Sequence, residues 1–169
     1  MNKLFSAGVC RLLFLLLLAS AGLFATACKD TASTPAAPDF SGIDEAIIKK
    51  YVADSSFTAA QRQSSGLYYV PVLANAAGVR ATAGKTVYVR YVGRLLSGRV
   101  FDSSGTAPFA FVLGRGRVIA GWEEGIALMR KGEKARLLIP SGMAYGASGA
   151  GSIPPNAVLR FDVELVEVL

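Results

Sequence analysis

The chain has 169 residues, enough for one domain with a sizeable core and some extensions. It contains no histidine, which excludes a His general base, a Ser-His-Asp or Cys-His nucleophile and a His-ligated metal. Its formal charge of +6 comes from scattered Lys and Arg, a pattern typical of a solvated surface, so we expect no nucleic-acid partner. The glycine-rich stretches 114–116 and 142–151 lack the Lys-Ser/Thr ending of a P-loop, which argues against nucleotide binding.

The first 27 residues are typical of a secretory signal peptide. Lys3 and Arg11 precede an apolar run over residues 12–24, and small residues follow it up to Ala27. A transmembrane anchor is the alternative, because residues 9–27 are nearly long enough to span a bilayer, but Arg11 interrupts that stretch. We therefore predict a cleaved leader over residues 1–27 and an exported protein of the cell envelope.

Cys28 directly follows these small residues and resembles the lipidated cysteine of a bacterial lipobox, although Ala25 stands where Leu is usual. We predict a lipid anchor at Cys28 and a location in the cell envelope, either the periplasm or the outer membrane, with plain secretion as the alternative. Cys10 would leave with the leader, so no disulfide is expected. Residues 28–42 are rich in Thr, Ala, Ser and Pro and are predicted to form a flexible tether.

Residues 43–65 are predicted to form a short helical extension. Ser41 is the expected N-cap, with Asp44 three residues later, and the helix should end near Ala53. One face of this helix carries Ile43, Ile47, Ile48 and Tyr51. That face could dock on its own domain, which we favour, or on a second copy, so we expect a monomer and leave a dimer open. Residues 57–65 give no clear signal and are predicted to be a linker with some helix.

From Gly66 the apolar period changes to the alternation of β-strands. The predicted strands cover 67–73, 86–92, 95–101 with a turn through Ser97-Gly98, 109–113, 134–139 and 158–169. Pro71 indicates an edge strand, and Val166 and Val168 break the alternation, which predicts a bulge near the end of the chain.

One short helix is predicted over residues 118–130. An apolar stripe recurs there at i, i+3, i+4 and i+7, namely Trp122, Gly125, Ile126 and Met129. Acids in the first turn, Arg130 and Lys131 at the end and Gly132 as a stop fit the helix dipole and a glycine cap. Residues 66–169 are therefore predicted to be an α+β domain, an antiparallel five- to six-stranded curled sheet wrapped around one short α-helix.

Seven motifs within this domain, taken in order, resemble the FK506-binding-protein (FKBP) family of peptidyl-prolyl cis-trans isomerases. They are Val89–Gly93, Phe101–Ser104, Pro108–Phe111, Gly121–Gly125, Ala144–Gly146, Ile153–Asn156 and Phe161–Leu165. Each is weak alone, but the ordered set extends over Gly66–Leu169, with its core in 84–169, and is specific. The resemblance implies an FKBP-like fold and an isomerase that needs neither a metal nor a cofactor.

The same resemblance implies the residues of a proline-binding pocket. Trp122 would be the floor under the proline ring, and the walls would be Tyr91, Phe101, Val118, Ile119 and Phe161, with Phe111 behind them. The Tyr145 hydroxyl and the Ile119 backbone N–H would donate hydrogen bonds to the ligand, and Asp102 would contact it from the rim. Ala144 would also contact substrate, and Ile153 would close the lip of the pocket.

Simpler interpretations exist for some of these residues. Trp122 could be core filler, Asp102 before two serines could form a turn, and Phe109 is assigned to the core rather than to the pocket. Two departures from the family pattern lie at the rim: Ala150 replaces a frequent His, and the short loop 103–107 has no Arg to pair with Asp102. Both bear on substrate preference and on affinity for macrolide inhibitors.

The expected function is acceleration of X-Pro rotation in exported polypeptides, with proline-containing clients as partners. The alternative is a proline-recognising chaperone or binding module on the same fold with little turnover. A third hypothesis is a structural envelope lipoprotein that does neither.

Overall fold

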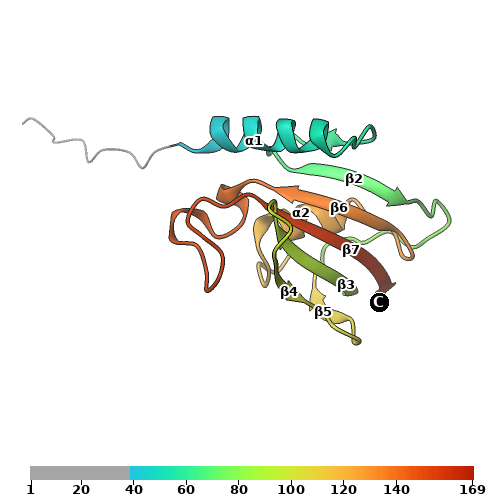
Figure 1. Ribbon diagram of the computed structural model, residues 1–169. Helices are drawn as coiled ribbons and strands as arrows, with labels where there is room; N and C mark the ends of the chain where they lie inside the picture. Colours follow the sequence, from blue (N-terminus) through green and yellow to red (C-terminus); the bar gives the residue numbers. More distant parts are fainter. Residues whose placement is uncertain (1–38) are drawn as a thin grey trace, which may run out of the picture. The chain divides into compact units, whose positions relative to one another are not determined.

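The computed structural model describes residues 39–169, so the predicted leader, Cys28 and most of the predicted tether lie outside the described residues (Figure 1). The elements, in chain order, are α1 (Ser41–Asp54), β1 (Gln61–Arg62), β2 (Tyr68–Leu73), β3 (Thr86–Leu95), β4 (Val100–Ser103), β5 (Phe109–Val112), α2 (Ala120–Ala127), β6 (Lys134–Ile139), the 3₁₀ helices η1 (Ser141–Met143) and η2 (Gly146–Ser148), and β7 (Leu159–Val168). Over the described range, no helix has the length and apolar character needed to cross a membrane.

Within residues 39–169 the strands form one antiparallel sheet in the order β1-β2-β6-β7-β3-β4, with β5 also paired to β3. Its centre is the long pairing of β3 with β7, which runs from Val87 opposite Val168 to Leu95 opposite Leu159. On the two central strands, β3 and β7, side chains at alternate positions such as Val87, Val89, Phe161, Val163 and Leu165 are buried on the inner face, where α2 lies. The predicted curled antiparallel sheet around one short helix is confirmed, with seven strands rather than five or six.

The helix α2 lies close to the sheet because two of its residues have no side chain. A Cβ atom added at Gly125 would lie 2.6 Å from Leu137 Cδ1 on β6, and one at Gly121 would collide with Ile139. The predicted stripe is confirmed, since Trp122, Gly125 and Ile126 are all buried. Glycine at these positions therefore sets the spacing between helix and sheet.

The helix is shorter than predicted at both ends. Ile119 is its N-cap and Leu128 its C-cap, so Arg130 and Lys131 lie outside it. Arg130 forms an isolated bridge with Arg80, and the Lys131 N–H donates to the Val79 carbonyl. The predicted placement of two bases in the last helical turn is therefore wrong, because pairing with the chain before β3 ends the helix early.

Two irregularities predicted from the sequence are confirmed. Tyr88 pairs with Glu167 and Val89 with Leu165, so Val166 has no opposite residue and forms the predicted bulge. Pro71 lies beyond the reach of β1, whose two residues pair only with Tyr68 and Tyr69, so this part of β2 is a sheet edge.

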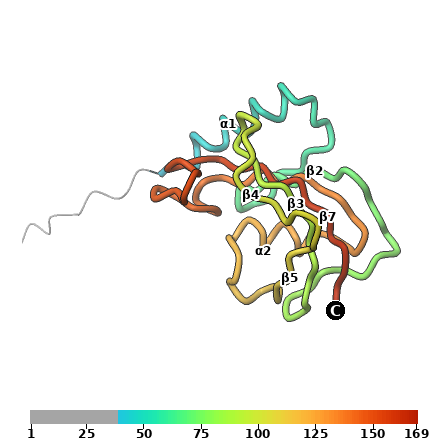
Figure 2. The backbone as a smooth tube through the Cα atoms, turned by 60° about the horizontal axis from the view of Figure 1, so that its bottom comes forward, coloured from blue at the N-terminus to red at the C-terminus, as the bar shows by residue number. Residues whose placement is uncertain are grey.

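The helix α1 lies along β2 (Figure 1), on the outer face of the sheet, whereas α2 lies on the inner face (Figure 2). Ile48 is fully buried there, against a cluster formed by Tyr68, Leu138 and Val158. Ile43 and Ile47 are 55% and 42% exposed, so the predicted apolar face is wrong for these two residues. The helix docks on its own domain, through Ile48 and its neighbours one turn away.

The start of α1 also differs from the prediction. Phe40 is the N-cap and Ser41 is already helical, with its N–H donated to Asp39 Oδ1 at 2.9 Å. Asp44 does not reach back to cap the helix but is buried, 1% exposed, against another segment. Residues 61–62, assigned to a linker, form β1.

We expect Gly125→Ala to lower the free energy of unfolding by about 1–3 kcal/mol, because the added methyl group must displace Leu137 or push α2 away from the sheet. Chemical denaturation measures this change. The matched control is Gly42→Ala in α1, where no atom lies within 4 Å of the added Cβ and better helix propensity should add about 0.5–1 kcal/mol. Equal effects of the two substitutions would contradict this account of helix spacing.

Candidate functional site

A cavity of about 390 Å³ opens on the inner side of the sheet beside α2. It is lined by Tyr91, Asp102, Phe109, Gly116, Arg117, Val118, Ile119, Trp122, Tyr145 and Phe161. These residues come from β3, β4, β5 and β7, from the segment that leads into α2, from α2 itself and from the segment between η1 and η2. The cavity thus forms where the curled sheet, the helix and two connecting segments meet.

Trp122 is the centre of the aromatic part of this cavity. Its ring lies 4.8 Å from Tyr91, 5.3 Å from Phe161 and 6.3 Å from Phe109, each in an edge-to-face arrangement. The indole is only 4% exposed, because α2 holds it against the sheet. Edge-to-face contacts of this kind hold aromatic rings in place, so the cavity has rigid apolar walls.

A glycine on the central strand β3, Gly93, leaves room for the aromatic rings of a second cavity wall. A Cβ at Gly93 would lie 2.7 Å from Phe101 Cε2 and 2.8 Å from Phe161 Cε1, which is closer than real contacts allow. The rings of Phe101 and Phe161 therefore pack over this position at a centroid distance of 5.4 Å, edge to face. Phe101 supports Phe161 in this way from outside the cavity lining.

The polar rim contains a tyrosine and an aspartate in direct contact. Tyr91 Oη donates to Asp102 Oδ2 at 2.7 Å, and the Ser103 N–H donates to Asp102 Oδ1 at 2.8 Å. Asp102 lies in β4, opposite Gly93, so it does more than form a turn. Burial, with the hydrogen bond to Asp102 and the charge of that carboxylate, raises the pKa of Tyr91 well above the ordinary 10.0, so the phenol keeps its proton further into the alkaline range than a free tyrosine.

Seven of the eleven residues predicted for the pocket line the cavity: Tyr91, Asp102, Val118, Ile119, Trp122, Tyr145 and Phe161. Four do not. Phe101 and Ala144 are partly buried against the core, and Ile153 is 7% exposed within it rather than at a lip. Phe111 lies behind the lining, 6.0 Å from Trp122, as the family resemblance implies.

The assignment of Phe109 to the core is wrong. It is 43% exposed and lines the cavity, stacked at 5.8 Å on the buried Phe111. The two rings share one face of β5, but Phe109 is the first residue of the strand and stays exposed, whereas Phe111 lies inside the strand and is buried. Alternation alone assigns the face of a residue and not its depth along the strand.

Sequence reasoning missed Gly116 and Arg117 in the lining. The segment that carries them is held by Glu123 of α2, whose Oε2 accepts the Gly114 N–H at 2.6 Å and whose Oε1 accepts the Gly116 N–H at 2.8 Å. Glu123 therefore fixes the position of this segment by accepting two of its backbone N–H groups, and is not merely a solvated acid in the first helical turn. No spacing in the sequence signals this contact.

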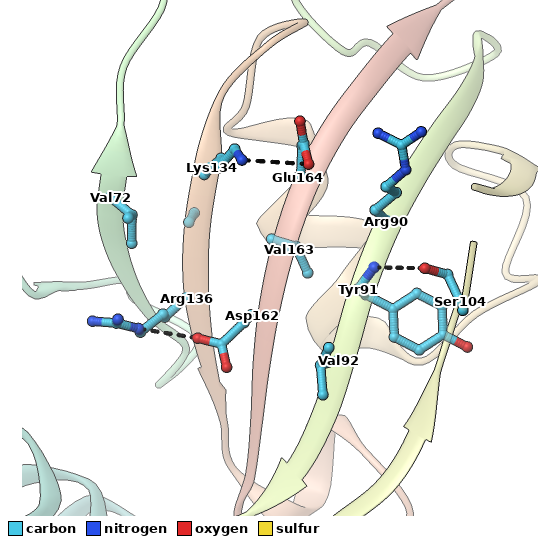
Figure 3. A pocket seen from close by; sticks show the side chains of 12 residues that line it. Val72, Arg90, Tyr91, Val92, Ser104, Lys134, Arg136, Asp162, Val163 and Glu164 are labelled. Carbon is cyan, nitrogen blue, oxygen red and sulfur yellow. Dashed lines mark hydrogen bonds and ion pairs between the residues drawn. The ribbon is translucent and has the colours of Figure 1, made fainter. Parts of the chain in front are cut away.

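A second hollow, of about 430 Å³, lies on the outer face of the sheet (Figure 3). Four of its charged side chains pair across neighbouring strands, with Lys134 3.5 Å from Glu164 and Arg136 3.0 Å from Asp162. The outer hollow thus carries ion pairs, whereas the inner cavity is lined by aromatic rings. Of these two, the inner cavity is the one that suits a compact apolar ring.

Comparison with known proteins gives a consistent result. A family model described as FKBP-type peptidyl-prolyl cis-trans isomerase matches residues 78–166. Peptidyl-prolyl cis-trans isomerase FKBP53 of Arabidopsis thaliana is 46% identical over 130 residues, which cover 75% of this chain and 27% of that protein. Peptidyl-prolyl cis-trans isomerase FKBP1A of Xenopus laevis is 54% identical over 88 residues, which cover 50% of this chain and 82% of that protein.

Two solved bacterial structures are also similar. FkpA from Escherichia coli superimposes with a TM-score of 0.65 at 40% identity, over 76% of this chain and 60% of that one. A peptidyl-prolyl cis-trans isomerase from Pseudomonas syringae gives a TM-score of 0.64 at 36% identity, over 78% of this chain and 96% of that one. The chain spans only 27% and 33% of the first two curated relatives, FKBP53 and the Dictyostelium discoideum FK506-binding protein 4.

We expect Tyr91 to ionise late in an alkaline titration followed by tyrosinate absorbance. Its contribution to the free energy of unfolding is complete below pH 10.0 and is lost as the pH rises towards the raised pKa of the folded state. Burial also raises the pKa of Tyr68, together with its hydrogen bond to Glu45, and that of Tyr69, to about 12, together with the charge of Glu133, so Tyr91→Phe should remove one of three late steps. Tyr88→Phe, on the outer face of the same strand, is the control and should leave all three; persistence of all three in Tyr91→Phe would contradict the Tyr91–Asp102 contact.

Proposed function

The chain belongs to the FKBP-type peptidyl-prolyl cis-trans isomerase family, and from this premise we propose that it accelerates rotation about X-Pro peptide bonds. The observation that carries the proposal is the aromatic cavity with the buried Trp122 as its floor. A volume of about 390 Å³ is in the range of small-ligand sites and accommodates a proline ring with its flanking peptide groups.

The chemistry requires no covalent step. Rotation about a peptide bond faces a barrier of about 18–20 kcal/mol, because resonance gives the C–N bond double-bond character. X-Pro bonds populate both isomers but exchange over roughly tens to hundreds of seconds. The twisted transition state has lost the resonance, so its carbonyl is less polar than in the planar ground state. A desolvated apolar cavity therefore disfavours the planar amide relative to the twisted one.

The rim supplies orientation. In our proposal the Tyr145 hydroxyl and the Ile119 N–H donate to carbonyl groups that flank the proline, while Asp102, held by Tyr91, faces the bound chain. A differential stabilisation of about 4–7 kcal/mol gives roughly a thousand- to hundred-thousand-fold acceleration. Burial of the ring, orientation and two hydrogen bonds are of the right size to supply it.

We further propose that the protein is exported, is anchored by lipid at Cys28, and acts on proline-containing clients in the cell envelope. The support is the leader pattern of residues 1–27 and the cysteine that follows it. Macrolides of the FK506 class are proposed ligands of the same cavity, because relatives such as FK506-binding protein 4 of Dictyostelium discoideum carry that binding in their names.

An isomerase assay on a proline peptide with the full chain tests the activity. We expect Trp122→Ala to lower kcat/KM by about a hundredfold and Tyr145→Phe by about tenfold, because the first removes the apolar floor and the second one hydrogen-bond donor. Tyr88→Phe is the control and should match the wild type. Peptide binding, followed by the fluorescence of the single tryptophan, without acceleration would favour a proline-recognising module, and neither binding nor turnover would favour a structural lipoprotein.

Metabolic labelling with a fatty acid tests the anchor. We expect the wild-type chain expressed in bacteria to carry the label and to sediment with membranes, and Cys28→Ala to lose both properties, because the acylated thiol is absent. Cys10→Ala is the matched control, since that residue would be removed with the leader. Label retained in a processed Cys28→Ala protein would refute the proposal.

A further inference from the structure

The helix α1 is joined to the segment that carries Tyr145 by one buried carboxylate. Asp44 Oδ2 accepts hydrogen bonds from both the N–H and the Oγ of Ser141, each at 2.7 Å. Asp44 is 1% exposed and Ser141 is 2% exposed, although 97 positions separate them in the chain. Two short hydrogen bonds between buried groups form a fixed junction, because water does not compete for them.

The junction satisfies a group that its own segment leaves unpaired. Ser141 is the first residue of η1, and its N–H is one of the donors that a helix start leaves without an internal partner. The N-cap residue is Pro140, which makes no side-chain hydrogen bond and has no side-chain oxygen to offer. Asp44 therefore supplies the missing N-terminal cap from a different element.

A short chain of backbone hydrogen bonds leads from this junction to the site. The Met143 N–H donates to the Pro140 carbonyl, and the Ala144 N–H donates to the Ser141 carbonyl, each at 3.0 Å. Tyr145 follows directly and is 39% exposed, so packing does little to fix its ring. The position of its hydroxyl over the cavity consequently depends on where η1 begins.

We propose that Asp44 is a positioning residue for Tyr145 and that α1 is a working part of the isomerase site. This inference rests on the proposed function, because the position of Tyr145 matters only if its hydroxyl donates to a bound prolyl peptide. Asp44 is not part of the cavity lining, so in this proposal it acts through Ser141 and η1.

The other attachments of α1 lead elsewhere and provide a control. Glu45 accepts hydrogen bonds from Arg62 of β1 at 2.9 Å and from Tyr68 of β2 at 2.8 Å, so its partners lie on these two strands and not on η1. Ile48 packs on the sheet itself. A substitution at Glu45 therefore loosens α1 without touching the segment that carries Tyr145.

The test compares Asp44→Ala with Glu45→Ala in the full chain. We expect Asp44→Ala to lower kcat/KM by about tenfold, mainly through kcat, because a displacement well below 1 Å at the donor is enough. Glu45→Ala should remain within about twofold of the wild type. Asp44→Asn keeps an oxygen in place for both Ser141 donors and should recover most of the loss, and Ser141→Ala, which keeps the N–H bond, should show a smaller loss than Asp44→Ala.

A double-mutant cycle with Tyr145→Phe distinguishes positioning from general stability. If Asp44 acts through Tyr145, the double variant Asp44→Ala/Tyr145→Phe should be about as active as Tyr145→Phe alone. Multiplied losses, or equal losses from Asp44→Ala and Glu45→Ala, would overturn the proposal.

Amide hydrogen exchange gives a reading that does not depend on turnover. We expect Asp44→Ala, but not Glu45→Ala, to speed exchange of the Met143 and Ala144 amides by about tenfold or more. Unchanged exchange there would overturn the inference even in an active enzyme. If Asp44→Ala speeds this exchange but the wild-type chain does not accelerate proline isomerisation, the structural role of the junction stands and the proposed function is rejected.

Discussion

The closeness of α2 to the sheet is the constraint from which the cavity follows. Gly121 and Gly125 bring the helix against Ile139 and Leu137, and this contact fixes the height at which the indole of Trp122 lies. The indole then meets Tyr91 and Phe161 from the two central strands, edge to face. Gly93 has the same role on the strand side, because it lets Phe101 and Phe161 pack over the backbone. The aromatic site thus depends on these three glycines, which allow close packing, as much as on the aromatic rings themselves.

The two faces of the sheet are specialised through the alternation of each strand. Along β7, Phe161, Val163 and Leu165 point to the core, whereas Asp162 and Glu164 point to the outer face and pair there with Arg136 and Lys134. The inner face borders the aromatic cavity, and the outer face carries these ion pairs and, on an apolar cluster of its own, the helix α1. Among the side-chain hydrogen bonds of residues 39–169, those between Asp44 and Ser141 join this helix to the segment that carries Tyr145.

Sequence patterns predicted what depends on local periodicity. The strands of the central sheet, the apolar stripe on α2, the edge at Pro71 and the bulge at Val166 all follow from neighbours a few residues apart. The errors arose where contact with a distant segment determines the structure. Asp44 is buried because it accepts hydrogen bonds from Ser141, far away in the sequence. The strand β1 was missed because its two residues are too few to show alternation.

The same limit applied to the site. The exposed position of Phe109 depends on where β5 begins along β3. Arg117 enters the cavity lining because Glu123 binds the backbone of the preceding glycines, Gly114 and Gly116. The FKBP resemblance supplied the pocket residues, which spacing alone did not.

The order of the strands has a consequence for how the chain becomes a folded domain. β7 ends at Val168, yet it lies between β6 and β3 and joins the two halves of the sheet. A ribosome that delivers the chain from its N-terminus therefore releases β7 after the other strands of this sheet, and until then β2 and β6 cannot be joined to β3. Contacts so distant in sequence close slowly, since a long loop must be ordered before any pairing compensates for it. The two halves of the sheet accordingly stay apart until β7 has been made and pairs with both of them.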